Sequence, residues 1–264
     1  MAEEYGHWYT PTGELQTEIG YADRKRVGEK RAVTLRDARK YGWYPSVTTV
    51  LTLLARPGLQ EWMLQNAIEC ALRMPNPTVE EVRAEADEYR DWAASQGSKI
   101  HLGLSEHFNG RPLEIEPEVD EIVREFWPWY RESGLSLQRA ELAVVSPLGY
   151  AGTVDYTGTY FGAAAVVDFK TQNFDAPHKA LFYDEHALQL AGYDEALGGP
   201  SRVRLSVILS REVPGLVAMH NWSEKIGENA RWSKAWLTLW KLWQILKNYY
   251  PVGEEHYDPD HPET

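Results

Sequence analysis

Two aspartates and a lysine stand near the ends of neighbouring strand-like segments in the middle of the chain. The segment AGTVDYTGTY carries Asp155, and the following segment AAAVVDFKTQ carries Asp168 and Lys170. Successive side chains of a strand point to opposite faces, so Asp168 and Lys170 share one face while Phe169 points into the other layer. Buried charges need partners, and a divalent cation is a suitable partner for two carboxylates. The pattern predicts a metal site, the alternative being a salt bridge between the lysine and an aspartate without metal.

Other polar residues are candidate members of the same site. Glu141 lies in the preceding strand-like segment, and in GSKIH the small residue Gly97 precedes His101 by one helical turn, so that the helix can approach the sheet. In QLAGY, Gln189 and Tyr193 are four residues apart and share one helix face. Each of these residues alone has an ordinary explanation, such as an exposed histidine, a solvent-facing glutamate or a tyrosine in the core.

The sequence pattern of the first half of the chain predicts mainly helices. Residues 45–135 have helical periodicity, with a first helix beginning at Ser46. A long polar helix is expected to begin at a capping box formed by Thr78 and Glu81, and the last helix of this region is expected to be interrupted near Pro128. This region is a candidate arch or lid over a site in the second half.

The second half reads mainly as a sheet. Residues 136–250 contain five strand-like segments, a helical segment between the third and the fourth, and a closing Trp-rich helical segment over 229–250. The spacing of the tryptophans favours packing of one helix face, and stacking on unpaired bases is the alternative. Residues 1–44 read as an irregular or hairpin-bearing N-terminal extension. We therefore expect residues 1–264 to form one α/β domain of the α+β type, with a helical N-terminal half and a central mixed sheet flanked by helices.

Composition excludes several classes of protein. The chain has 264 residues, a formal net charge of -12 and a single cysteine, Cys70. The negative charge argues against a protein that coats nucleic acid non-specifically, because that affinity comes mainly from Lys and Arg. One cysteine excludes a disulfide framework and a Cys-based zinc or iron–sulfur site. Neither a leader pattern nor an apolar stretch of about 20 residues is present, so we expect a cytoplasmic protein without a membrane partner.

The ordered set of polar residues resembles the RecB-type branch of the PD-(D/E)XK nuclease superfamily. The stretch YPSVTTVL is further similar to phage and prophage exonucleases and to the mitochondrial genome maintenance exonuclease. The resemblance covers roughly residues 44–250 and implies a restriction-endonuclease-like core. Val154 stands where the superfamily name has proline, which is frequent in this branch. The resemblance rests on five pieces in order: Gly97-x-x-x-His101, Glu141, Gly152-Thr153-Val154-Asp155, Asp168-Phe169-Lys170 and Gln189-x-x-x-Tyr193.

The resemblance implies a role for each residue of the set. Asp155 and Asp168 would be the metal-binding carboxylates, with the Phe169 carbonyl and His101 as further ligands of Mg²⁺ or Mn²⁺. Lys170 would be the catalytic lysine, because an ammonium group can orient the attacking water and offset charge on the phosphate. The remaining members would support the site: Glu141 would steady it or hold a second ion, and Gln189 and Tyr193 would position the lysine, the water or the substrate strand.

The implied function is a metal-dependent DNA exonuclease in recombination, replication or repair, in a bacterial or phage-infected cell. Its substrate would be linear DNA with a free end, single-stranded or with processed ends, and a recombination partner protein is possible. The alternatives are an inactive DNA-binding or recombination-partner module of the same fold, an endonuclease, and a metallohydrolase of small phosphate esters. Four residues are candidate phosphate contacts: Ser46, Thr48, Thr49 and Lys99. Other basic positions are candidates to line a groove: residues 24–31, Arg111, Lys179 and Lys234.

Overall fold

A five-stranded mixed sheet lies at the centre of the chain. The computed structural model describes residues 6–21, 28–111, 115–199 and 202–253. The strand order is β10-β9-β8-β7-β6; β8 and β9 are parallel and all other neighbours are antiparallel. The α+β class, the mixed sheet and the helical first half are confirmed. The strands are β6 (Leu135–Val145), β7 (Ala151–Tyr160), β8 (Ala163–Gln172), β9 (Val203–Ser210) and β10 (Val217–Asn221).

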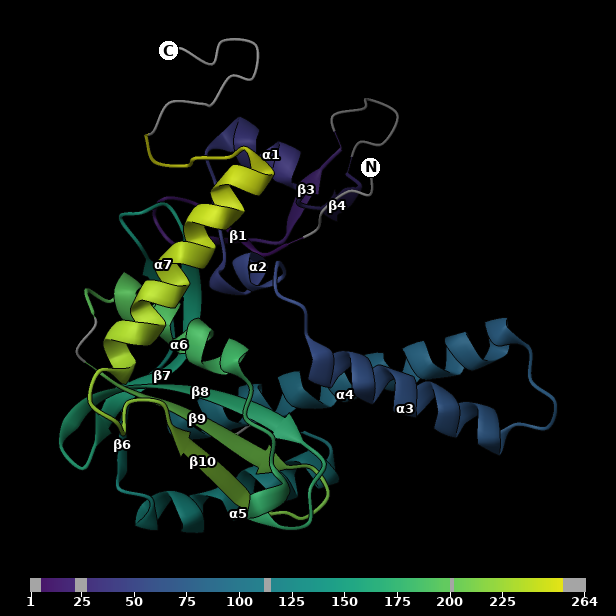
Figure 1. Cartoon of the computed structure of the whole chain (residues 1–264). Helices are drawn as coiled ribbons and strands as arrows, with labels where there is room; N and C mark the ends of the chain where they lie inside the picture. Colours follow the sequence, from purple (N-terminus) through teal and green to yellow (C-terminus); the bar gives the residue numbers. More distant parts are fainter. Residues whose placement is uncertain (1–5, 22–27, 112–114, 200–201, 254–264) are drawn as a thin grey trace.

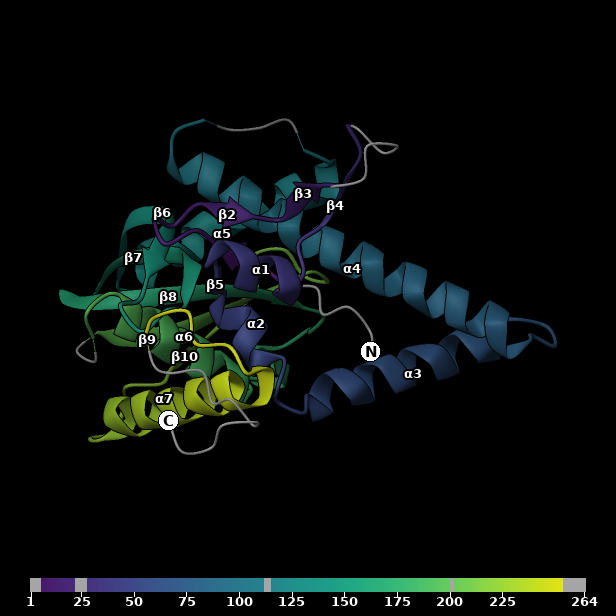
Figure 2. The same cartoon turned by 90° about the horizontal axis from the view of Figure 1, so that it is seen from above.

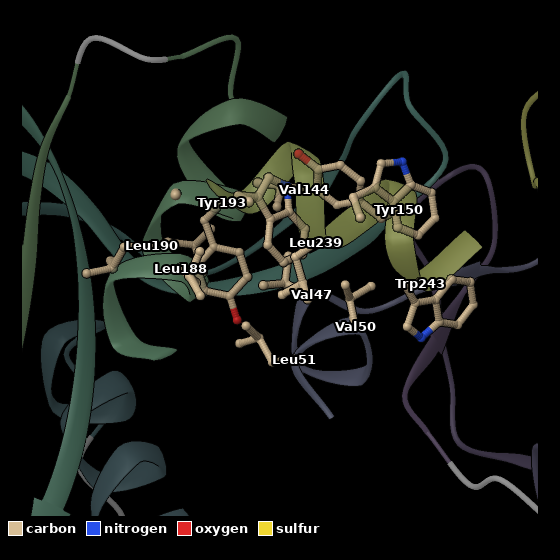
Figure 3. Packing of buried hydrophobic residues seen from close by; sticks show 14 of the residues in the cluster. Val47, Val50, Leu51, Val144, Tyr150, Leu188, Leu190, Tyr193, Leu239 and Trp243 are labelled. Carbon is tan, nitrogen blue, oxygen red and sulfur yellow. The ribbon is translucent and has the colours of Figure 1, made fainter. Parts of the chain in front are cut away.

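One face of the sheet is covered by helices α6 (Asp184–Ala196) and α7 (Glu228–Lys247), as Figure 1 shows. Parallel strands need a long crossover, and α6 supplies it between β8 and β9. The short helix α2 (Val47–Leu51) packs into the same core, where side chains of α2, α6 and α7 interdigitate (Figure 3). The packing interpretation of the Trp-rich segment is confirmed, because these residues of α7 are all buried: Trp232, Trp236, Leu239, Trp240 and Trp243.

The other face of the sheet packs against α5 (Pro117–Glu132) and the C-terminal part of α4 (Val79–Phe108). Phe169 lies in this layer, edge-on to Phe126 at 5.5 Å between ring centroids. The expected interruption at Pro128 is wrong: α5 continues through this residue to its end one turn later. The proline removes a hydrogen bond only near the helix terminus, where burial of the apolar face of α5 holds the helix together.

Helices α3 (Pro57–Arg73) and α4 form a long antiparallel pair that projects from the body of the molecule, as both views show (Figures 1 and 2). The capping box at the start of α4 is confirmed. The Glu81 backbone N–H donates to Thr78 Oγ1 at 3.2 Å, and the Glu81 carboxylate accepts from the Thr78 backbone N–H at 2.8 Å. We call this helix pair the arm.

The N-terminal region consists of short elements, and the hairpin-bearing alternative is the one that the structure supports. Strands β1 (Trp8–Tyr9), β2 (Leu15–Gln16) and β5 (Tyr44–Pro45) form one small sheet, β3 (Glu18–Gly20) and β4 (Lys30–Ala32) form a hairpin, and α1 (Leu35–Tyr41) follows. Ser46 is the N-cap of α2, as predicted, and it also bridges to Ala151 at the start of β7. Through this bridge the N-terminal region is attached to the central sheet. None of the helices within the described ranges is both long and apolar enough to span a bilayer.

Candidate metal centre

The centre begins where strands β7 and β8 stop pairing. Their ladder runs from Tyr160–Ala163 to Tyr156–Val167. Just beyond the end of this ladder, the backbone N–H of Phe169 donates to Asp155 Oδ2 at 2.7 Å. The Asp155 carboxylate therefore takes the place of a backbone acceptor and lies in the opening between the two strands. Burial raises the pKa of Asp155, and the charge of Lys170 opposes that effect.

Glu141 lies opposite Asp155 on the neighbouring strand β6. The pairs Ala140–Tyr156 and Leu142–Val154 bracket the two acids. Glu141 has a φ of 49°, in the left-handed region that non-glycine residues seldom adopt. Backbone strain of this kind costs about 1–3 kcal/mol and is concentrated at functional sites. Although Glu141 is exposed as a residue, partial burial of its carboxyl group and the nearby charge of Asp155 raise its pKa to about 7.

His101 completes a set of three possible ligands. One donor atom from each of His101, Glu141 and Asp155 lies within 4.8 Å of the others, and His101 Nδ1 is 3.6 Å from Asp155 Oδ2. The predicted close approach of the helix is confirmed, because a Cβ atom on Gly97 would lie only 3.2 Å from Thr171 Oγ1. Burial, together with the charge of Lys170, lowers the pKa of His101 to about 4. The imidazole is therefore neutral near pH 7, as metal ligation requires.

Asp168 and Lys170 form a separate pair beside this set. The Asp168 side chain is fully buried, and Lys170 Nζ donates to its Oδ1 at 2.7 Å. The second oxygen, Oδ2, lies 2.6 Å from the same Nζ but has no hydrogen bond of good geometry among the described residues. Burial raises the pKa of Asp168 to about 6, against the opposing charge of Lys170. One buried oxygen of this carboxylate is thus left to accept a further partner.

Helix α6 holds Asp168 in place from above the sheet. Gln189 Nε2 donates to Asp168 Oδ1 at 2.8 Å and lies 3.1 Å from the hydroxyl of Tyr193. The prediction that Gln189 and Tyr193 share one face is therefore borne out by their contact. Gly152 allows this packing, since a Cβ atom there would lie 2.6 Å from Tyr193 Cε1. These two side chains orient the carboxylate that in turn orients Lys170.

The donor set fits a hard divalent cation. Carboxylate oxygens suit Mg²⁺, and the imidazole makes Mn²⁺ equally suitable. The raised pKa values of Glu141 and Asp155 reflect acids crowded away from water, which a bound cation would stabilise in their charged form. Glu141 groups with His101 and Asp155, whereas Asp168 is engaged by Lys170 and Gln189. A direct metal bond from Asp168 or from the Phe169 carbonyl remains a prediction.

The candidate phosphate-binding hydroxyls bind one another. Ser46 Oγ lies 2.9 Å from Thr48 Oγ1 and 2.8 Å from Thr49 Oγ1, and Thr49 Oγ1 also donates to the backbone carbonyl of His7 at 3.2 Å. Lys99, the fourth candidate, forms an ion pair with Glu116. Their contact with nucleic acid therefore remains a prediction.

Two of the additional basic positions within the described ranges are already paired with acids. Arg111 pairs with Glu106 at 3.2 Å and Lys179 with Asp175 at 2.7 Å. Lys234 lines cavities beside α7, and residues 24–27 of the basic run lie outside the described ranges.

Sequence reasoning missed two side chains beside the centre. The hydroxyl of Tyr9, on β1, lies 2.9 Å from Thr153 Oγ1, and the charge of Glu141 contributes to a raised pKa of Tyr9. No local pattern links β1 to the sheet, so this tyrosine could not be found from spacing. His186, on α6, lies one turn before Gln189 and three residues away from it, a helical spacing that could have identified it.

Comparisons with known proteins add little to this geometry. No family model and no curated protein matches the chain. Among solved structures, one titled "Crystal structure of SSO0001" is 19% identical, with an alignment that covers 73% of this chain and 88% of that chain and a TM-score of 0.30. Similarity at that level supports no conclusion about activity.

Proposed function

We propose that this chain is a metal-dependent deoxyribonuclease that hydrolyses phosphodiester bonds from the ends of linear DNA, in recombination, replication or repair. The observation that carries the proposal is the grouping of His101, Glu141 and Asp155, with donor atoms within 4.8 Å of one another, next to the Lys170–Asp168 pair. The resemblance of the ordered residues to RecB-type nucleases supports the same reaction class.

Each side chain has a part in the proposed reaction. A bound Mg²⁺ or Mn²⁺ would polarise a phosphoryl oxygen and lower the pKa of a water molecule. Lys170, held by Asp168, directs its ammonium group toward the attacking water and the phosphate, where it offsets negative charge that develops during attack. Gln189 keeps Asp168 oriented, and neutral His101 supplies a lone pair without adding positive charge.

The arm supports the proposal of end-dependent cleavage. His101 lies on α4, so the same helix that supplies a candidate ligand extends outward as half of the arm (Figure 2). A strand that passes along the projecting part of the arm, formed by α3 and the N-terminal part of α4, would reach the centre by threading. Threading requires a free end, and it predicts that covalently closed circular DNA resists cleavage.

The test uses the purified chain with labelled linear DNA and with closed circular DNA of the same sequence. Cleavage of linear DNA with Mg²⁺ or Mn²⁺, abolished by EDTA, is the expected result. Cleavage of both forms would redirect the proposal to an endonuclease. Binding of DNA without cleavage under either metal would favour the inactive DNA-binding module and overturn the proposal.

A further inference from the structure

A buried histidine on α6 has no place in the chemistry described so far. His186 is only 6% exposed, and its Nδ1 atom is buried without a hydrogen-bond partner in the described part of the structure. Ala187 and Leu188, the next two residues of the helix, are buried apolar side chains. A buried unpaired ring nitrogen is unfavourable, and an apolar residue would avoid that penalty. The imidazole therefore calls for an explanation beyond packing.

Two contacts fix where His186 lies along strand β8. At one end, Gln189 Nε2 donates to Asp168 Oδ1 at 2.8 Å. At the other, the Gln172 side chain makes two hydrogen bonds to the backbone of Leu181, at 2.8 and 3.0 Å. The segment that contains His186 thus runs antiparallel to β8, and His186 falls between the two contacts, beside the stretch that carries Lys170.

The electrostatics agree with this placement. Burial and the positive charge of Lys170 lower the pKa of His186 to about 3. The ring is therefore uncharged at neutral pH and can accept a hydrogen bond from a cation.

The imidazole also packs against Tyr183, the residue that precedes α6. The rings of Tyr183 and His186 meet edge to face, with centroids 5.5 Å apart and planes at 84°. Tyr183 in turn fills the space over Gly58 in the first turn of α3, where an added Cβ atom would lie 2.4 Å from Tyr183 Cε1. Tyr183 therefore links the imidazole of His186 to the first turn of α3.

We propose that His186 is a positioning residue for Lys170, whose ammonium group it helps to direct toward the metal centre. The ammonium group has three donors, and the Asp168 carboxylate, which lies against it, engages only part of them. An imidazole that packs against Tyr183 offers a further acceptor through a bridging water molecule, without adding a second positive charge. The inference rests on the proposed nuclease function and adds a residue to it.

The test compares the wild-type chain with His186→Ala, His186→Asn and His186→Gln in cleavage of linear DNA. For His186→Ala, kcat should fall about 10- to 100-fold, the range for residues that orient groups at a metal site. KM for DNA should stay unchanged, because His186 would act on the lysine and not on the substrate. Recovery of kcat by Asn identifies Nδ1 as the acceptor, and recovery by Gln identifies Nε2. The matched control is His178→Ala, because His178 is an exposed histidine.

The outcomes separate this inference from the proposed function. A wild-type chain that cleaves no DNA overturns both. An active wild type with unchanged kcat in His186→Ala overturns the positioning role alone. A change confined to KM also overturns the positioning role. So does a loss of activity that is explained in all three variants by a loss of folded protein, measured by thermal unfolding. A fall in kcat with an unchanged melting temperature and recovery by one amide variant supports the role.

Discussion

Helix α6 contributes a side chain to each of two acid–base groups, one structural and one at the candidate centre. Near its C-terminal end Asp194 pairs with the fully buried Arg204 of β9 at 2.9 Å. Closer to its middle, Gln189 holds Asp168, which pairs with Lys170 of β8 at 2.6 Å. Both groups bring charge into the protein interior, where unpaired charge is strongly unfavourable. They differ in how completely their hydrogen-bonding atoms are used.

The Arg204 group is saturated. Its guanidinium donates to Asp194 at 3.0 Å, to the Asn229 carbonyl at 3.1 Å and to the Ser233 hydroxyl at 2.7 Å. Asp194 also accepts from Arg202 at 3.0 Å. This network ties α6, β9 and α7 together, and each side-chain nitrogen of Arg204 and each carboxylate oxygen of Asp194 has a partner in it.

The Lys170 group is incomplete. Asp168 Oδ2 and His186 Nδ1 are buried without good hydrogen bonds, and the Lys170 side chain remains 31% exposed. Glu141, Asp155 and Asp168 have raised pKa values. Saturation indicates a structural role, whereas open hydrogen-bonding capacity beside shifted carboxyl groups indicates a site for chemistry.

Removal of Lys170 should have the largest effect on function. In Lys170→Ala we expect cleavage of linear DNA to fall about 10³-fold or more, because the charge that stabilises the transition state is lost. DNA binding should persist, as should the fold, because Asp168 can take up a proton when its partner is removed. Cleavage kinetics and denaturant unfolding measure the two effects. Unchanged cleavage would remove the lysine from the mechanism.

Removal of Arg204 should lower stability and leave the activity of the folded protein unchanged. In Arg204→Met we expect a loss of about 3–5 kcal/mol in the free energy of unfolding, because Asp194 loses its buried partner. Cleavage per folded molecule should stay close to the wild-type value. Urea denaturation and active-site-normalised kinetics test this. A variant that keeps its stability but loses activity would show that the two groups are not separate in function.

The pH dependence of metal binding should be the smallest effect. The pKa of Glu141 is raised to about 7, so this carboxyl group is mostly protonated at pH 6 and mostly ionised at pH 8. A cation competes with that proton, and the apparent Mn²⁺ affinity should therefore rise roughly tenfold across this interval.

Glu141→Gln should abolish the rise of Mn²⁺ affinity between pH 6 and pH 8. The control Glu132→Gln, at the exposed end of α5, should keep that rise. Calorimetric titration at both pH values provides the measurement. In the metal-free protein the raised pKa has a second consequence: the folded state holds this proton more tightly than the unfolded state, so the contribution of Glu141 to stability declines as pH rises from about 4.5 to 7. A slope that survives in Glu141→Gln would assign the titration to another group.

Much of the candidate centre could be predicted because its pieces are local. Asp168 and Lys170 share a strand face through the two-residue repeat, and Gln189 and Tyr193 share a helix face through the four-residue spacing. Both expectations agree with the contacts in the structure. Gly97 similarly indicated the close approach of α4 to the sheet.

Other features depend on register and could not be read locally. The place where the β7–β8 ladder ends, and the irregularity of β6 between Leu137 and Arg139, decide that Glu141 faces Asp155. Neither the end of the ladder nor the irregularity of β6 is marked by a local sequence signal, because packing on both faces of the sheet selects where a bulge forms.

The sequence by itself determined the order and type of most elements and the faces on which their polar side chains lie. These properties follow from periodicity within a single segment. Only the tertiary structure decided that His101, Glu141 and Asp155 share one place while Asp168 is held by Lys170, and that His186 and Tyr9 lie beside them. Such groupings join residues far apart in the chain, and they depend on strand register and on how α4 and α6 pack across the sheet.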